Sequence, residues 1–279
     1  MRVGERQQEV RVSEPPEESR VSELRGDLRS ELRGELRPSV PAPGIEPTIG
    51  VLALQGDFAA HATALARAGA GRIHEVRKRG ELSACDGLVL PGGESTTLIK
   101  LLKEEALWDP LRRFADEGRA LFGTCAGLIL MAEKVIAPEQ DSLALLPVQV
   151  RRNGYGRQVD SHVVPGRVRI PDDFSPEERR GLRWSPATER EADAASVPVP
   201  QIFENEAGAF FDTEFVFIRA PKILSCGAGV ETLAHQGNDP VLVRSGLRMA
   251  AAFHPEIARD DGVARLFLAL ARRARARRE

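Results

Sequence analysis

The pattern of hydrophobic and polar positions changes character at residue 48 and again in the second half of the chain. Between these points, short and almost continuous apolar runs alternate with segments whose apolar residues recur at helical spacing. Continuous apolar runs are typical of strands that are buried on both faces of a parallel sheet. The runs that we predict to be strands are "TIGVLAL", "RIHEV", "GLVLPGG" and "ALFGT". Helices are predicted between them at 59–68, in "STTLIKLLKEE" and "WDPLRRFADEG", and directly after residue 125. This order predicts an α/β fold of three layers, in which helices flank a mostly parallel central sheet.

The second half predicts shorter strands and a long polar interruption. The stretch "LLPVQVRRNGYGRQVDSHVV" alternates like a hairpin around Asn153 and Gly154. "EFVFIRAP" is predicted to be a strand, and "VLVRSGLRMAAAFHPE" a second hairpin that ends in a charged loop. Residues 172–208 are polar, contain proline and lack periodicity, so we expect a surface insertion there. A closing amphipathic helix is predicted over 262–273, which places the domain at 48–274 and a tail at 275–279.

The first 47 residues differ from the rest. They are rich in Arg, Glu, Ser and Pro, and they contain "SELRGDLR" followed by the similar "SELRGELR". Leucine recurs there every fourth residue, but each of two glycines weakens a helix by about 1 kcal/mol relative to alanine. We interpret residues 1–47 as a low-complexity, disordered extension. A partner-binding helix and an over-long start of the chain are the alternatives.

Composition excludes several classes of protein. The 279 residues are 42% hydrophobic and 29% charged, which is ordinary for a globular protein. A net charge of −2 gives no electrostatic basis for binding nucleic acid or a membrane surface. No apolar run approaches the roughly 20 residues that span a bilayer, and the polar N-terminus resembles no signal or transit peptide. Three widely spaced cysteines make neither a disulfide framework nor a metal site, so we expect a reduced, cytoplasmic protein without a metal.

One cysteine lies in a setting that favours reactivity. Cys125 stands between Gly123 and Gly127, where a predicted strand ends and a helix begins. Gly-x-Cys-x-Gly reproduces the nucleophile elbow, whose small residues permit a strained turn, and a helix N-terminus favours thiolate. An inert buried cysteine is the alternative for Cys125, and it is the better interpretation for Cys85 and Cys226.

Other groups could complete an acyl-transfer site. In "FHPE", His254 and Glu256 are two residues apart, so in extended chain both side chains point to one side. The histidine could then serve as base and the glutamate could orient it, although a surface His-Pro-Glu turn is common. In "PGGES", flexible glycines could turn the N–H of Gly93 toward an oxyanion, with the N–H of Ala126 as second donor. A plain tight turn that caps the next helix is the alternative for "PGGES".

These motifs together resemble a known family. "PGGEST", "GTCAGLILMA" and "FHPE", in this order and spacing, are similar to the class I, triad-type glutamine amidotransferases, whose fold is flavodoxin-like. "VLALQGDFAAH", "RRNGYGRQVDSH" and "FIRAP" resemble, within that group, the glutaminase-subunit family of pyridoxal 5′-phosphate synthase. The similarity covers nearly all of residues 48–274.

The resemblance implies an activity and a set of site residues. Cys125 would be the nucleophile, and His254 and Glu256 would complete the triad. Residues that would contact the substrate L-glutamine are Gly93, Glu94, Ser95, Arg152, Ile218 and Arg219. The enzyme would need no cofactor and would hydrolyse glutamine to glutamate and ammonia. It would pass the ammonia to a separate synthase (lyase) subunit in a hetero-oligomeric complex, whose docking orders the oxyanion turn, so that the isolated chain would be nearly inactive.

Two departures from the family and two other functions remain to be weighed. The extension and the insertion are not part of the compact family pattern, and His162 stands where the family usually has an aromatic residue. Another cysteine hydrolase or stress protein on a similar elbow would leave "PGGES", Arg152 and "FIRAP" without a reason to co-occur. A non-catalytic binding subunit would have no chemical need for an intact triad.

Overall fold

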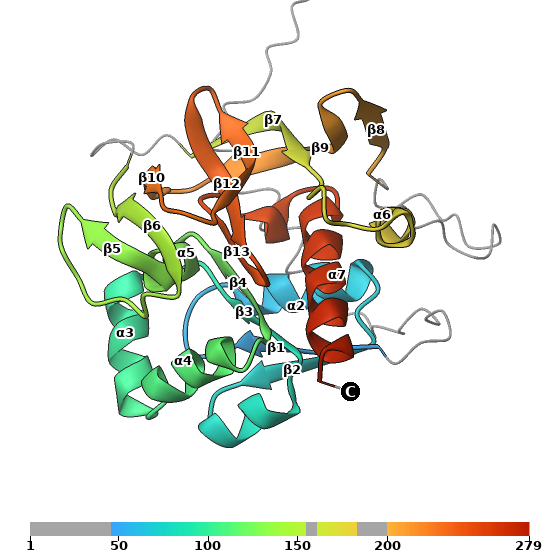
Figure 1. The fold of residues 1–279 in the computed structure, drawn as a ribbon. Coiled ribbons are helices and arrows are strands. Elements are labelled where there is room, and N and C mark those ends of the chain that lie inside the picture. Colours follow the sequence, from blue (N-terminus) through green and yellow to red (C-terminus); the bar gives the residue numbers. More distant parts are fainter. Residues whose placement is uncertain (1–45, 155–160, 183–199, 279) are drawn as a thin grey trace, which may run out of the picture.

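The computed structural model describes residues 46–154, 161–182 and 200–278 (Figure 1). All but the last two positions of the predicted N-terminal extension lie outside the described residues. The predicted insertion is described at 172–182 and 200–208 only.

A sheet of seven strands forms the centre of the molecule, in the order β11-β12-β13-β4-β3-β1-β2. Its members are β1 (Thr48–Leu52), β2 (Arg72–Val76), β3 (Gly87–Leu90), β4 (Ala120–Thr124), β11 (Glu231–Gln236), β12 (Asp239–Ser245) and β13 (Arg248–Ala251). The strands from β2 to β13 are parallel, whereas β12 and β11 are antiparallel additions at the other edge. All residues of β1, β3 and β4 are buried, while β2 at the edge is mostly exposed, as its mixed sequence requires. The predicted α/β fold is therefore confirmed, with a sheet that is parallel over most of its width.

Helices cover both faces of this sheet. Residues that alternate along β4 face different helices: the Phe122 ring lies 5.5 Å from that of Phe267 in α7, whereas Gly123 faces Gly127 and Met131 of α5. Helices α2 and α7 thus cover one face, and α5, with α3 and α4 beside it, covers the other (Figure 1). The helices are α2 (Phe58–Arg67), α3 (Ser95–Glu104), α4 (Trp108–Asp116), α5 (Ala126–Met131), α6 (Pro176–Leu182) and α7 (Gly262–Ala276). Two 3₁₀ turns are η1 (Arg79–Ala84) and η2 (Pro255–Ile257).

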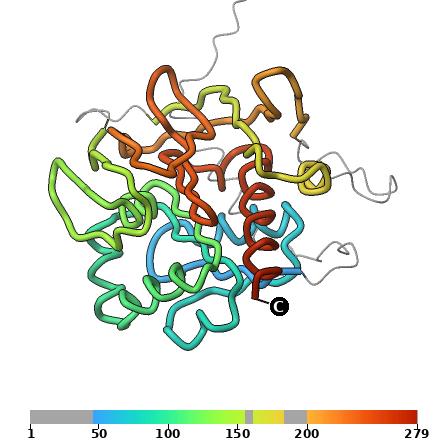
Figure 2. Tube along the Cα trace, in the orientation of Figure 1, coloured from blue at the N-terminus to red at the C-terminus, as the bar shows by residue number. Residues whose placement is uncertain are grey.

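Two small sheets lie beyond the carboxyl ends of the central strands. One has the order β10-β6-β5 and the other the order β7-β9-β8. Their strands are β5 (Ala132–Ile136), β6 (Leu146–Arg151), β7 (His162–Arg169), β8 (Ile202–Asn205), β9 (Gly208–Phe217) and β10 (Lys222–Cys226). The Cα trace shows this part of the chain, in yellow-green and orange, on the side of the molecule where the central strands end (Figure 2).

The hairpin predicted around Asn153 and Gly154 is wrong. β6 pairs with β10 and β5, and β7 pairs with β9 in the other small sheet. A Cβ on Gly154 would lie 2.4 Å from Lys222 Cβ, so this turn packs against β10 instead of closing a hairpin. Local alternation predicted the strands correctly but not their partners, which come from a later part of the chain. The second predicted hairpin forms as expected, from β12 and β13.

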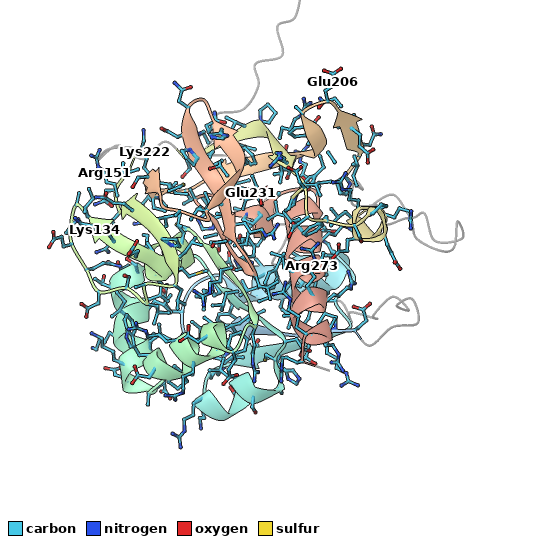
Figure 3. All side chains as sticks on the ribbon, in the orientation of Figure 1. Lys134, Arg151, Glu206, Lys222, Glu231 and Arg273 are labelled. Atoms are coloured by element: carbon cyan, nitrogen blue, oxygen red, sulfur yellow. The ribbon has the colours of Figure 1, made fainter. Side chains whose placement is uncertain are left out.

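The described start of the predicted insertion is anchored by ion pairs. Asp173 accepts two hydrogen bonds from Arg244, at 2.8 and 2.7 Å, and a third from Arg273 at 2.8 Å. Arg273, which Figure 3 labels on α7, also pairs with Glu178 in α6 and lies over the Phe174 ring. Phe174 is buried, so this segment contributes an aromatic ring to the core beside α7.

Within the described ranges, no helix combines the length and the apolar character that crossing a bilayer requires.

Candidate active site

Three neighbouring strands of the central sheet end at the candidate site. Gly92 follows β3, Cys125 follows β4 and His254 follows β13, and β4 lies between the other two. In the sheet, β2 lies on one side of β1 and β3 lies on the other, so the direction in which the chain adds strands reverses between β1 and β3. Ligands of doubly wound sheets bind at the carboxyl edge near such a reversal. The fold therefore gathers the three sequence motifs at the edge where a ligand is expected.

Cys125 adopts the backbone conformation of a nucleophile elbow. Its φ is +49° and its ψ −101°, a strained conformation for a residue with a side chain. The Cys125 N–H donates to Ala251 O at 2.9 Å, which ties the elbow to β13. A Cβ on Gly127 would lie 2.0 Å from Leu90 O, and one on Gly123 2.6 Å from the Gly127 carbonyl carbon. Both flanking glycines are thus required by backbone contacts, which explains the spacing around the cysteine.

His254 and Glu256 form a buried hydrogen-bonded pair. His254 Nδ1 lies 2.7 Å from Glu256 Oε1, and the side chains are 8% and 0% exposed. The backbone N–H of His254 donates to Val216 O at 2.8 Å, which holds the histidine to the end of β9. The two side chains meet through the 3₁₀ turn η2, whereas the sequence led us to expect extended chain.

The charges in this pair support each other. Burial favours the neutral form of His254. Glu256 and Cys125 outweigh this effect of burial and raise the pKa of His254 well above its ordinary value. Burial likewise opposes the carboxylate of Glu256, but His61 and His254 beside it hold the pKa of that carboxyl well below its usual range. At neutral pH this arrangement favours an imidazolium at His254 beside the carboxylate of Glu256.

Gly92 shows how closely the cysteine and the histidine approach each other. A Cβ on Gly92 would lie 2.5 Å from His254 Cε1 and 3.3 Å from Cys125 Cβ. Replacing Gly92 with alanine is therefore expected to displace the imidazole and to lower the turnover number kcat of a reaction at Cys125 by about 100-fold. A steady-state assay of the protein's catalytic activity measures this loss. Gly80→Ala is the matched control, because a Cβ there has no atom within 4 Å. Equal activity of the two variants would contradict the proximity argument.

The two predicted oxyanion donors are the N–H group of Gly93, which follows β3, and the N–H group of Ala126, which follows Cys125. Gly93 has φ +150°, and its Cβ position is occupied by the Gln55 amide, with Oε1 at 2.6 Å. Gln55 Oε1 also accepts from the Glu94 N–H at 3.0 Å, so this side chain holds the glycine turn. Ala126 begins α5 directly after Cys125. Among the described residues, neither the Gly93 nor the Ala126 N–H has a hydrogen-bond partner.

Glu94 and Arg152 are brought together from opposite sides of the site. Arg152 Nη2 donates to Glu94 Oε1 at 2.5 Å, and the Glu94 side chain is 44% exposed. Glu94 Oε2 accepts from the Thr97 N–H at 2.7 Å and caps α3. Burial opposes the carboxylate of Glu94, but the hydrogen bonds from the hydroxyls and N–H groups of Thr96 and Thr97 together outweigh burial and lower the pKa of Glu94 to about 2. The neighbouring Ser95 hydroxyl donates to Gln140 Oε1 at 3.0 Å.

The remaining predicted residues follow β9. Ile218 O lies 4.0 Å from Cys125 Sγ, so the backbone of this residue borders the nucleophile. Arg219 has φ +46° and an exposed side chain. The unusual His162 stacks on Phe217 with a centroid distance of 4.9 Å, which is a contact that an aromatic ring would also make.

Sequence reasoning missed one buried residue of the site. His61, on the inner face of α2, lies 3.3 Å from Glu256 Oε2 and 3.0 Å from Thr124 Oγ1. The sequence places it among the small apolar residues of a predicted amphipathic helix, which is where a buried histidine would be sought. Its partners come from distant segments, so no spacing in the sequence points to them. The described part of the chain holds no cluster of three or more His, Cys, Asp or Glu side chains placed to bind a metal ion.

Comparison with known proteins gives consistent matches. Residues 51–169 match the family model of the SNO glutamine amidotransferases. The chain is 43% identical over 220 residues to the pyridoxal 5′-phosphate synthase subunit PdxT of Solibacter usitatus, which covers 79% of this chain and 97% of that protein. It is 41% identical over 225 residues to the PdxT of Thermus thermophilus, with 80% and 97% covered. A crystal structure of a glutamine amidotransferase matches with a TM-score of 0.62 at 40% identity, over 80% of this chain and 98% of that structure.

Proposed function

Because this chain belongs to the PdxT family of glutamine amidotransferases, we propose that Cys125, His254 and Glu256 are its catalytic triad of class I type. The protein is the glutaminase subunit of pyridoxal 5′-phosphate synthase: it hydrolyses L-glutamine and provides ammonia for vitamin B6 synthesis. The observation that carries the proposed triad is the buried chain from Glu256 through His254 to the cysteine in a strained elbow.

The first half of the reaction forms a thioester. The Cys125 thiolate attacks the side-chain amide carbon of glutamine, and the carbonyl oxygen becomes an oxyanion. The N–H groups of Gly93 and Ala126 donate to this oxygen. As the tetrahedral intermediate collapses, the imidazolium of His254 gives its proton to the departing nitrogen, which leaves as ammonia.

The second half regenerates the enzyme. His254, now neutral, takes a proton from water while the water oxygen attacks the thioester carbon. Collapse of this second intermediate breaks the carbon–sulfur bond, releases glutamate and restores the thiolate beside the imidazolium. Glu256 accepts from His254 Nδ1 throughout, and so fixes the tautomer and stabilises the positive charge.

Arg152 is proposed to hold the α-carboxylate of glutamine, because its guanidinium is positioned by Glu94 and Thr96 at the edge of the site. We expect Arg152→Gln to raise KM for glutamine by about 10- to 100-fold with a much smaller change in kcat, because the lost charged contact is made equally in the ground and transition states. Steady-state glutaminase kinetics measure both constants. The matched control is Arg151→Gln, since this neighbouring arginine projects from the end of β6 at the surface (Figure 3). An unchanged KM for Arg152→Gln would remove Arg152 from the binding site.

The roles of the other predicted residues follow from their places. Glu94 orients Arg152. Because both residues lie at the edge of the site, we expect the Glu94 carboxylate also to contact the α-ammonium of glutamine. The Ile218 carbonyl lies 4.0 Å from Cys125 Sγ, and we propose that Ser95, Ile218 and Arg219 complete the glutamine site. We further propose a cytoplasmic, hetero-oligomeric complex with the synthase subunit, in which docking orders the Gly92–Gly93 turn.

The function is tested by glutamate release from L-glutamine, with and without the synthase subunit. Turnover that requires the subunit supports the proposed activation together with the reaction. Turnover by the isolated chain at the same rate would reject the activation alone. No turnover under any condition, despite a demonstrated complex, would reject the triad and favour a non-catalytic subunit.

A further inference from the structure

A buried histidine outside the proposed triad contacts two parts of the site. His61 is 3% exposed, and its Nε2 lies 3.0 Å from Thr124 Oγ1 and 3.3 Å from Glu256 Oε2. Thr124 is fully buried and directly precedes Cys125, while Glu256 holds His254. The imidazole of His61 therefore links the strand that carries the nucleophile to the acid that orients the base.

The surroundings of His61 are those of an apolar core. Its ring meets Phe122 edge to face at 6.4 Å, and beside it lies a cavity of about 10 Å³ whose lining includes Leu65 and Val89. A side chain that only filled space here would be apolar, because burying a polar ring costs free energy unless its nitrogens are bonded. The polar contacts of His61 with Thr124 and Glu256 offset that cost.

The second carboxylate oxygen of Glu256 lies beside His61. Glu256 Oε1 accepts from His254, whereas Glu256 Oε2 is buried and lacks a hydrogen bond of good geometry among the described residues. His61 Nε2, which can donate a hydrogen bond, lies 3.3 Å from Oε2. With its proton on Nε2, the imidazole presents a positive edge to this oxygen and opposes rotation of the carboxylate away from His254.

A neutral imidazole suits this position better than a charged one. Burial lowers the pKa of His61, Glu256 and Asp57 act to raise it, and His254 acts to lower it further, so that the net shift is downward. A neutral His61 orients the carboxylate through a dipole. It leaves the full negative charge of Glu256 to stabilise the imidazolium of His254.

We propose that His61 is a positioning residue for the proposed reaction: it holds the Glu256 carboxylate and the Thr124 hydroxyl in one arrangement, so that His254 stays aligned with Cys125. The inference rests on the proposed function, and it adds to the triad a residue that touches neither substrate nor the reacting atoms.

Two substitutions at His61 separate positioning from space filling. His61→Leu fills much of the volume but removes both polar contacts, whereas His61→Gln can place an amide N–H near the position of Nε2. In the complex with the synthase subunit, we expect His61→Leu to lower kcat for glutamine about 10- to 100-fold with little change in KM, and His61→Gln to recover most of that loss. His74→Gln, at an exposed position of β2, is the matched control and is expected to leave both constants unchanged.

A pH profile gives a result that a purely structural role would not produce. The groups that face His254 are Glu256 and Cys125, and His61 acts on it through Glu256. When the carboxylate is no longer held, the imidazolium loses support, so the basic limb of kcat/KM moves to lower pH in His61→Leu and returns in His61→Gln. Equal loss in both variants with an unchanged profile would overturn the proposal.

A further measurement does not depend on glutamine turnover. The rate at which iodoacetamide alkylates Cys125, followed by peptide mass spectrometry, reports the thiolate that His254 stabilises. We expect this rate, at neutral pH, to fall several-fold in His61→Leu relative to wild type and to His61→Gln. If the wild type released no glutamate yet showed this dependence, the positioning role would stand and the proposed function would fail. If alkylation were the same in all three proteins, the positioning role would fail whatever the glutaminase assay showed.

Thr124→Val provides a second route should His61→Leu fold poorly, because valine keeps the shape of threonine and lacks only the hydroxyl. We expect a few-fold loss of kcat in Thr124→Val and no additional loss when it is combined with His61→Leu, since both changes break the same contact. Independent, multiplying losses would show that Thr124 and His61 do not act together.

Discussion

Replacing Cys125 with alanine is expected to reduce glutamate release by about 10⁴-fold or more, because no other described group can form the thioester. Cys85 is buried in the core, and burial raises the pKa of its thiol to about 11. Cys226 is half-buried in β10, and burial raises the pKa of its thiol as well. Steady-state assays of the complex with the synthase subunit measure the loss.

The fold of the Cys125→Ala variant should be retained. The positive φ at this position strains alanine about as much as cysteine, so the change adds little backbone cost. Circular dichroism and binding to the synthase subunit check this. Cys226→Ala is the matched control and should keep the activity of the wild type. Substantial glutamate release by Cys125→Ala would contradict covalent catalysis at this residue.

Replacing Glu256 with glutamine is expected to lower kcat by about 10²- to 10⁴-fold. The neutral amide no longer stabilises the imidazolium of His254, and its NH₂ group can favour the wrong tautomer. Since Glu256 raises the pKa of His254 in the wild type, its loss allows that pKa to fall. The imidazolium then loses its proton at lower pH, so the basic limb of the activity profile moves toward neutrality.

The pH dependence of kcat/KM, measured for wild type and Glu256→Gln, tests this direction. Glu231→Gln serves as the control, because this acid begins the edge strand β11 and pairs with Arg169 there. A basic limb that stays in place, or moves to higher pH, would show that Glu256 does not support the charge on His254.

Much of this site could be predicted from the sequence because its parts are local. Gly123 is required by its contact with Gly127 within one strand–helix turn, whereas Gly127 is required by Leu90 of the neighbouring strand β3. Both glycines nevertheless stand beside Cys125 in the chain. His254 and Glu256 are two residues apart, and their contact depends on the short turn η2. Features of this kind leave a spacing that can be recognised.

Other features depend on partners that are distant in the chain. His61 meets Thr124 across 63 residues and Glu256 from another strand end, so its neighbours alone predict only a buried helix position. The pairing of β6 with β10, in place of a local hairpin, has the same origin. Alternation along a strand sets which face is buried, but the partner strand is set by the whole fold.

The central claim is that Cys125 carries a glutamyl thioester, and it is tested most directly by rapid acid quench of the complex during turnover of L-glutamine. Peptide mass spectrometry of the quenched protein then locates any adduct. The account predicts a glutamyl group on the peptide that contains Cys125, absent from Cys125→Ala and from complex without glutamine. Continued glutamate release with no adduct at Cys125, or an adduct on another residue, would contradict it.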